Sequence, residues 1–169
     1  MTITPILPIN MEKIVLGIDP GIADTGYGFI RVNGSRLDCL EYGSIKTPAG
    51  APLPERLQTL YIELSRLLQK HRPQAAAVEQ LFFNKNVRTA LIVGQARGVA
   101  LLAISQAGVP LSDFTPAQVK QAVSAYGQAS KLQVQKMVKL ILNLKELPQP
   151  NDAADALAVA ICGANHHRY

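Results

Sequence analysis

The sequence has few of the residues that usually build zinc sites and histidine-dependent catalytic dyads. Its 169 residues include 2 cysteines, 3 histidines and no tryptophan. Cys39 and Cys162 lie far apart and outside any metal-ligand spacing, and no His-x-x-x-His pair occurs. These absences argue against structural zinc and histidine catalysis, and they predict a reduced, cytoplasmic protein.

Long apolar runs and a secretory signal are also missing. No apolar run approaches the ~20 residues that span a bilayer, and residues 1–10 (MTITPILPIN) lack a cationic start and a cleavage site. We therefore expect neither export nor membrane insertion. Residues 1–10 hold two prolines ahead of a second methionine, Met11, and are expected to be a loose extension. Residues 11–169 fit a single domain of ordinary size.

Acidic residues are scarce in one long segment. The chain carries 17 Lys and Arg against 12 Asp and Glu, a net charge of +5. Residues 80–145 hold eight basic residues and one acid, Asp113, so this segment is +7 and the rest nets −2. The eight are Lys85, Arg88, Arg97, Lys120, Lys131, Lys136, Lys139 and Lys145. Nucleic acid is a natural partner for this segment, although a solvated cationic face explains it equally well.

Short apolar runs and turn signals predict strands followed by alternating strands and helices. Strands are expected over 13–19, 26–32, 36–45, 75–79 and 110–114, the first three as a meander. Helices are expected over 57–68, 86–107, 131–144 and 151–164, with a short one opened by Thr115 and Pro116. This order predicts an α/β three-layer fold, a mixed five-stranded sheet with helices on both faces.

Four acids stand in apolar surroundings. Asp19 and Glu79 each end a predicted buried strand, and parallel neighbouring strands would bring both to the sheet edge where α/β proteins bind ligands. Asp152 and Asp155 are spaced i, i+3 on one face of the last predicted helix. Asp152 could equally cap that helix, Asp19 hold a turn and Glu79 pair with a lysine. Asp155, one turn into an Ala-rich segment, has no capping role.

Taken together, the four acids favour a metal site. Converging carboxylates repel one another and are desolvated, which divalent cations relieve. Oxygen donors without His or Cys favour Mg²⁺ or Mn²⁺ over zinc. Two such ions can hydrolyse a phosphodiester, and the +7 segment would attract its backbone. The residues therefore predict a metal-dependent nuclease.

The motifs of the chain, in order, resemble those of the bacterial RuvC Holliday junction resolvases. They are GIDPG at 17–21, TGYG at 25–28, VEQLF at 78–82, GQARGVA at 94–100, QVKQAV at 118–123 and DAADALAVA at 152–160. The resemblance implies a ribonuclease H-like fold and a homodimer that resolves four-way DNA junctions by symmetric paired nicks, in homologous recombination and DNA repair. It also implies two Mg²⁺ ions per active site, replaceable by Mn²⁺, and nicks that leave a 5′-phosphate. The implied ligands are Asp19, Glu79, Asp152 and Asp155.

The resemblance assigns further residues. Phe82 corresponds to an aromatic that stacks on an unpaired junction base, although it would serve equally well in a core. Lys120 and Lys131 align with catalytic lysines near the cut phosphate, against the default of a solvated lysine. Lys85 and Arg88 are plausible phosphate contacts.

A pair of glycines and one extra acid remain. Gly94 and Gly98 lie four apart on the helix that borders the family's dimer interface, although the pair could instead pack on the sheet. The RuvA–RuvB branch-migration complex is a further implied partner. Asp24 is an acid to which the pattern assigns no role.

Three other functions compete with junction resolution. A related ribonuclease H-like nuclease could act on RNA, and a non-catalytic protein could bind junctions without cutting them. An actin-type ATPase is suggested by GIDPG alone, but such proteins enclose a nucleotide between two related domains and this chain holds one.

Overall fold

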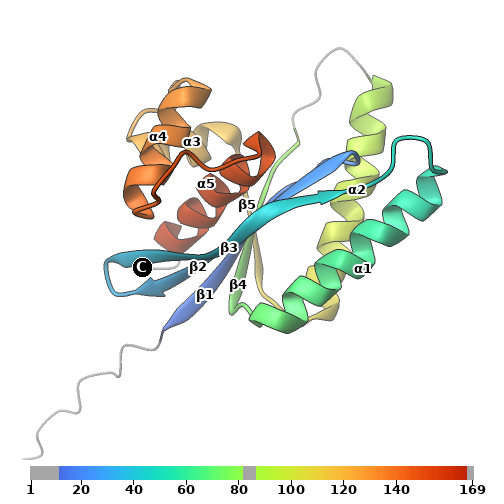
Figure 1. Ribbon diagram of the computed structural model, residues 1–169, viewed down its shortest axis with the longest axis horizontal. Helices are drawn as coiled ribbons and strands as arrows, with labels where there is room; N and C mark the ends of the chain where they lie inside the picture. Colours follow the sequence, from blue (N-terminus) through green and yellow to red (C-terminus); the bar gives the residue numbers. More distant parts are fainter. Residues whose placement is uncertain (1–11, 82–86, 167–169) are drawn as a thin grey trace, which may run out of the picture.

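The computed structural model of the protein describes residues 12–81 and 87–166 (Figure 1). The predicted extension over residues 1–10 lies outside the described residues, and so do Phe82 and Lys85. The predictions made for them therefore stay predictions.

Five strands form one mixed sheet. They are β1 (Lys13–Asp19), β2 (Asp24–Asn33), β3 (Arg36–Lys46), β4 (Ala75–Glu79) and β5 (Leu111–Phe114). Their order across the sheet is β3-β2-β1-β4-β5. β1, β2 and β3 pair antiparallel as a meander, whereas β4 lies parallel to both β1 and β5. The predicted mixed five-stranded sheet is confirmed.

The helices cover both faces of this sheet, as predicted (Figure 1). They are α1 (Leu53–His71), α2 (Val87–Gln106), α3 (Pro116–Ser124), α4 (Lys131–Ile141) and α5 (Asn151–His166). α1 and α2 share one apolar core with alternate residues of the strands, such as Leu16 and Ile18. α3, α4 and α5 share the other core with the residues between, such as Val15 and Ala77.

Several helix boundaries differ from the predicted ranges, and two of the differences have a clear local cause. α1 begins at Leu53, because Pro52 is its N-cap and Pro54 falls in the first turn, where a missing N–H leaves no hydrogen bond broken. This helix, predicted over residues 57–68, therefore starts earlier than the apolar pattern indicates. α4 ends at Ile141 rather than Leu144, since Leu142 is its C-cap and Asn143 has a φ of 51°.

α2 is long and apolar for a helix that is largely exposed. By length and composition alone its 20 residues could cross a membrane, and 22% of its most apolar 18-residue window is buried. Arg97 interrupts its apolar sequence and forms an ion pair with Asp113 of β5. The buried face of α2 is made mainly of alanines, Ala96, Ala100 and Ala103, together with Ile104.

Candidate active site

α5 lies directly on the strands because glycines face it. A Cβ built on Gly17 of β1 would lie 2.1 Å from the carbonyl oxygen of Ala156, and one built on Gly26 of β2 would lie 1.9 Å from that of Asp152. No side chain other than hydrogen fits at such distances. These two glycines of the GIDPG and TGYG motifs therefore let the first turns of α5 rest on β1 and β2.

Three of the four acids meet at this contact. Asp19 ends β1 and pairs in register with Gly26, the residue against which the backbone of Asp152 packs. One carboxylate oxygen each from Asp19, Asp152 and Asp155 can be chosen so that all lie within 4.8 Å of one another. Oxygens at this spacing can share one cation, and their donor chemistry fits Mg²⁺ or Mn²⁺.

Glu79 approaches the same place from the neighbouring strand. β4 lies parallel to β1, with Val78 opposite Ile18, so Asp19 and Glu79 follow at the same sheet edge. Glu79 is outside the group of three, but it lines a pocket of about 210 Å³ together with Asp155. The pocket therefore joins the strand-end acid Glu79 to Asp155 of α5.

Burial and mutual repulsion raise the pKa values of Asp19, Glu79 and Asp152. The pKa of Asp19 rises from 3.8 to about 8, first through burial and then through the charges of Glu79, Asp155 and Asp152, against the opposing charge of Lys131. Burial is also the main cause that raises the pKa of Glu79, followed by the charge of Asp155. Without a cation, Asp19 and Glu79 resist ionisation, which is the conflict that a bound divalent cation relieves.

Two lysines of the +7 segment lie at this pocket. Lys131, at the start of α4, places its Nζ 2.9 Å from Oδ2 of Asp155. That hydrogen bond is the main cause that raises the pKa of Lys131, so the ammonium stays charged. Lys120 of α3 also lines the pocket, and its charge lowers the pKa of Glu79. Neither is simply a solvated lysine, whereas Arg88 is exposed in the first turn of α2 and lies outside the residues that line the pocket.

Asp24 is the neighbour of the site whose role the sequence pattern did not reveal. It begins β2, two residues before Gly26 and hence on the same face of the strand. The hydroxyl of Ser44 donates to its Oδ1 at 3.0 Å. After burial, the charge of Asp24 is the largest cause that raises the pKa of Asp152. The i, i+2 spacing from Gly26 was the available signal, but it has meaning only once Gly26 is known to face α5.

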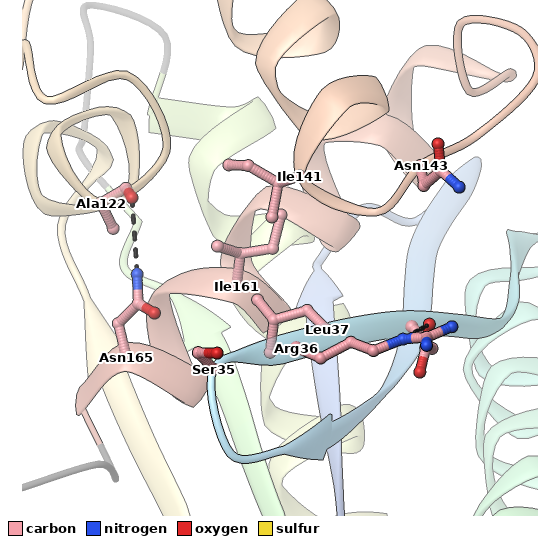
Figure 2. Close-up of a pocket in the computed structure, with 9 residues that line it drawn as sticks. Ser35, Arg36, Leu37, Ala122, Ile141, Asn143, Ile161 and Asn165 are labelled. Carbon is pink, nitrogen blue, oxygen red and sulfur yellow. Dashed lines mark hydrogen bonds and ion pairs between the residues drawn. The ribbon is translucent and has the colours of Figure 1, made fainter.

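A larger pocket, of about 500 Å³, lies at the other end of α5. Figure 2 shows Ile141 of α4, Ile161 of α5 and Leu37 of β3 between the helices and the β2–β3 hairpin. Asp38, the acid that lines it, is paired with Arg36 at 2.8 Å. None of the four acids lines this pocket, so it is not the candidate active site although it is the larger of the two pockets.

Comparison with known proteins gives consistent matches over most of the chain. The family described as crossover junction endodeoxyribonuclease RuvC matches residues 15–163. The crossover junction endodeoxyribonuclease RuvC of Pelotomaculum thermopropionicum is 56% identical over 156 residues, covering 92% of this chain and 95% of that protein. That of Rubrobacter xylanophilus is 54% identical over 157 residues, covering 93% and 88%.

Solved structures agree with these matches. Thermus thermophilus RuvC in complex with a Holliday junction substrate has a TM-score of 0.88 and 40% sequence identity, over 92% of this chain and 95% of that one. The yeast mitochondrial Holliday junction resolvase Ydc2, with a TM-score of 0.60 and 18% identity, shares the fold. The predicted ribonuclease H-like fold is confirmed.

Proposed function

The chain belongs to the RuvC family of crossover junction endodeoxyribonucleases, and on that basis we propose that its four acids bind the cations with which it cleaves four-way DNA junctions. The observation that carries the proposal is the group of Asp19, Asp152 and Asp155, whose carboxylate oxygens lie within 4.8 Å of one another. The Holliday junction bound by the Thermus thermophilus relative, 40% identical to this chain, supports the choice of substrate. A protein that only binds junctions would have no use for carboxylates beside a phosphate backbone, which repel it.

We propose Mg²⁺ as the cation, two per active site, with Mn²⁺ able to replace it. When bound, such ions activate water and stabilise the charge on the leaving oxygen of a phosphodiester. Asp19, Asp152 and Asp155 would hold one ion, and Glu79, which lines a pocket together with Asp155, would hold the other. The all-oxygen donor set supports hard divalent cations over zinc.

The two lysines at the pocket would act on the substrate. Lys120 and Lys131 line the pocket beside Glu79 and Asp155, so each can place positive charge at the scissile phosphate. The hydrogen bond of Lys131 to Asp155 also fixes the orientation of that carboxylate. Positive charge aimed at a pentavalent phosphate stabilises it more than the ground state.

Contacts to the rest of the junction are proposed from the family and from charge. Arg88, exposed in the first turn of α2, and Lys85 would bind backbone phosphates. Phe82 would stack on an unpaired base at the junction centre. These contacts position the DNA and carry no sequence information by themselves.

A homodimer is proposed through the exposed face of α2. Val87, Leu91 and Leu102 are 78%, 63% and 51% exposed, and at 100° per residue they share one face with Gly94 and Gly98. A Cβ built on Gly98 would meet nothing within 4 Å among the described residues outside its own helix, and one on Gly94 would meet only Leu81, at 4.0 Å. The pair therefore faces away from the sheet, where a second copy could approach closely.

Further proposals concern the cellular setting. A dimer with two such sites would nick opposite strands symmetrically and leave 5′-phosphates, in recombination and repair of bacterial DNA in the cytoplasm. The RuvA–RuvB complex would supply the branch-migrated junction. Residues 11–169 would form one nuclease domain.

The test uses a synthetic four-way DNA junction labelled in turn on each strand. Wild-type protein should nick two opposing strands with Mg²⁺ and none in EDTA, and a junction of the same sequence made of RNA should stay intact. Asp19→Asn and Glu79→Gln should bind the DNA junction without cleaving it. Cleavage by either variant at the wild-type rate would contradict the site, and cleavage of RNA in preference to DNA would contradict the substrate.

A further inference from the structure

An exposed tyrosine lies between the two lysines of the active-site pocket along the chain. Tyr126 is 60% exposed and belongs to the loop over residues 125–130, which joins α3 to α4. Lys120 is in the helix before this loop, and Lys131 is the first residue of the helix after it. Both lysines line the pocket that holds Glu79 and Asp155. An aromatic side chain left in water on a loop that joins these two helices contributes little to the core and is available to a ligand.

The loop that carries Tyr126 is held by a network of hydrogen bonds. The hydroxyl of Ser124 lies 2.6 Å from the carbonyl oxygen of Lys120 and 2.9 Å from that of Tyr126. The N–H of Ala129 donates to the same Tyr126 oxygen at 3.2 Å. Ser130 then starts α4 with a capping box that includes Gln133. The backbone on both sides of the ring is therefore fixed, so little conformational entropy is lost when a ligand binds the ring.

The sequence on both sides of Tyr126 is basic, which indicates the chemistry of that ligand. No acidic residue occurs between Asp113 and Glu146, whereas this interval holds five lysines. An aromatic ring flanked by lysines is the combination with which proteins bind unpaired nucleotides, the ring stacking on a base and the ammonium groups binding phosphates. A protein partner would need acidic groups against this surface, whereas junction DNA supplies both the charge and the unpaired bases.

We propose that Tyr126 stacks on an unpaired nucleobase beside the scissile phosphate and so holds the strand for cleavage. The proposal rests on the proposed function, because it needs junction DNA in the pocket. The stacking surface is the ring itself, and the phenol hydroxyl, which donates to Oε1 of Gln128 at 3.2 Å, only orients it. Tyr126 would thus be a second aromatic contact with the DNA. It follows the pocket residue Lys120 in the sequence, whereas Phe82, proposed above to stack on a base, follows Glu79.

The experiment measures binding of a four-way DNA junction in EDTA over a series of salt concentrations. Tyr126→Ala should weaken binding by about 5-fold to 150-fold, the range found when a base-stacking aromatic is removed. Because the ring neutralises no phosphate, the slope of log affinity against log salt should stay at its wild-type value. Tyr126→Phe should bind within about 2-fold of wild type, since the stacking face is kept. Leu140→Ala is the matched control, because Leu140 is 70% exposed on the adjacent α4 and should be neutral.

A base analogue gives a direct readout of stacking. 2-aminopurine placed at the nucleotides around the cut site should lose fluorescence on binding wild type and Tyr126→Phe, and stay bright with Tyr126→Ala. Three results would overturn the role of Tyr126 and leave the proposed function standing. They are equal affinity of Tyr126→Ala and wild type, a loss of affinity in Tyr126→Phe as large as in Tyr126→Ala, and unquenched 2-aminopurine in the wild-type complex. Failure of the wild-type protein to prefer a junction over duplex DNA would instead overturn the proposed function.

Discussion

At the scale of single residues, the site consists of carboxyl groups that the fold holds close together. The opposing charge of Lys131 does not neutralise all of them. Asp19 is the extreme case, with its pKa raised to about 8 by burial and by three neighbouring acids. Lys131 offsets part of this repulsion through its hydrogen bond to Asp155. In the cation-free site the carboxylates therefore repel one another, and both pH and a bound metal ion should change the charge state of Asp19.

The first prediction concerns the stability of the metal-free protein. The folded pKa of Asp19 lies above its unfolded value of 3.8, so its stabilising contribution is complete below that value and is lost as pH rises through about 8. The melting temperature in EDTA should therefore fall between about pH 4 and pH 8 and level off above that range. Asp19→Asn should reduce that fall, because an amide does not titrate. Thermal unfolding followed by circular dichroism measures both, and identical pH profiles for the two proteins would contradict the assignment.

A second residue-scale prediction concerns Asp24. Its charge raises the pKa of Asp152, so Asp24→Asn should lower that pKa and weaken Mg²⁺ binding by roughly 2-fold to 5-fold through lost attraction. Asparagine keeps an oxygen that can accept from Ser44, which preserves the local hydrogen bond. Titration calorimetry with Mg²⁺ and a carboxyl NMR titration supply the two readouts.

Asp38→Asn is the control for this change. It removes the same charge from the β2–β3 hairpin, beside Arg36 and away from the four acids. Its Mg²⁺ affinity should equal that of wild type. An equal loss in both variants would mean that only net charge matters and that Asp24 has no particular place in the site.

At the scale of elements, the contact between α5 and the β1–β2 pair decides where the acids meet. α5 is buried on nearly every side, so its position is set by packing rather than by solvent. Gly17 and Gly26 remove the Cβ atoms that would hold it off the sheet. These two glycines therefore shape the candidate site through this spacing.

The third prediction tests this contact. In Gly26→Ala the new methyl group would meet the carbonyl of Asp152, and because backbone cannot rotate aside, the helix start must shift. The variant should lose about 2 kcal/mol or more of unfolding free energy, the range of overpacked sites. It should also bind Mg²⁺ more weakly than wild type. Chemical denaturation and calorimetry measure the two effects.

Gly50→Ala is its control. A Cβ on Gly50 meets nothing within 4 Å among the described residues, and its φ carries no left-handed requirement. That substitution should leave the unfolding free energy within about 0.5 kcal/mol of wild type. A Gly26→Ala protein as stable as Gly50→Ala would show that α5 does not rest on β2 as described.

At the scale of the whole molecule, the exposed apolar face of α2 is the surface on which the proposed homodimer depends. The helix packs on the sheet through alanines and turns its larger apolar residues outward. Exposed apolar faces of this kind are typical of interaction sites. The homodimer proposed above would cover this face, because its two outward glycines would let a second copy of the chain approach closely.

The fourth prediction follows from this face. Leu102→Asp should convert the dimer to a monomer, since a carboxylate would be buried against its own copy at the interface. The monomer should still nick one strand of a junction at a time, but it should no longer nick two opposing strands of the same junction together. Analytical ultracentrifugation and a supercoiled cruciform plasmid, which scores one nick against two, separate these properties. Ile62→Asp on α1, where Ile62 is 40% exposed, should remain dimeric. A dimer that survives Leu102→Asp would place the interface elsewhere.

The sequence by itself determined the strand order of the meander, the alternation that follows and the identity of the acids. These depend on local features: a buried strand that ends in an acid, as at Asp19 and Glu79, and an i, i+3 pair on a helix, as at Asp152 and Asp155. Such features occupy a few consecutive residues, so the pattern of polar and apolar side chains reveals them. Element ends were less predictable, because capping at Pro52 and Leu142 decides them.

Only the tertiary structure decided how these pieces meet. It brings Asp152 to Asp19 across more than a hundred residues, places Glu79 and Asp155 in one pocket, and sets the charge of Asp24 beside Asp152. It also turns Gly98 outward and Gly26 inward, although both are glycines in equally apolar stretches. The physical reason is that distance and burial between remote segments depend on how helices pack on the sheet, and no local pattern of residues contains that packing.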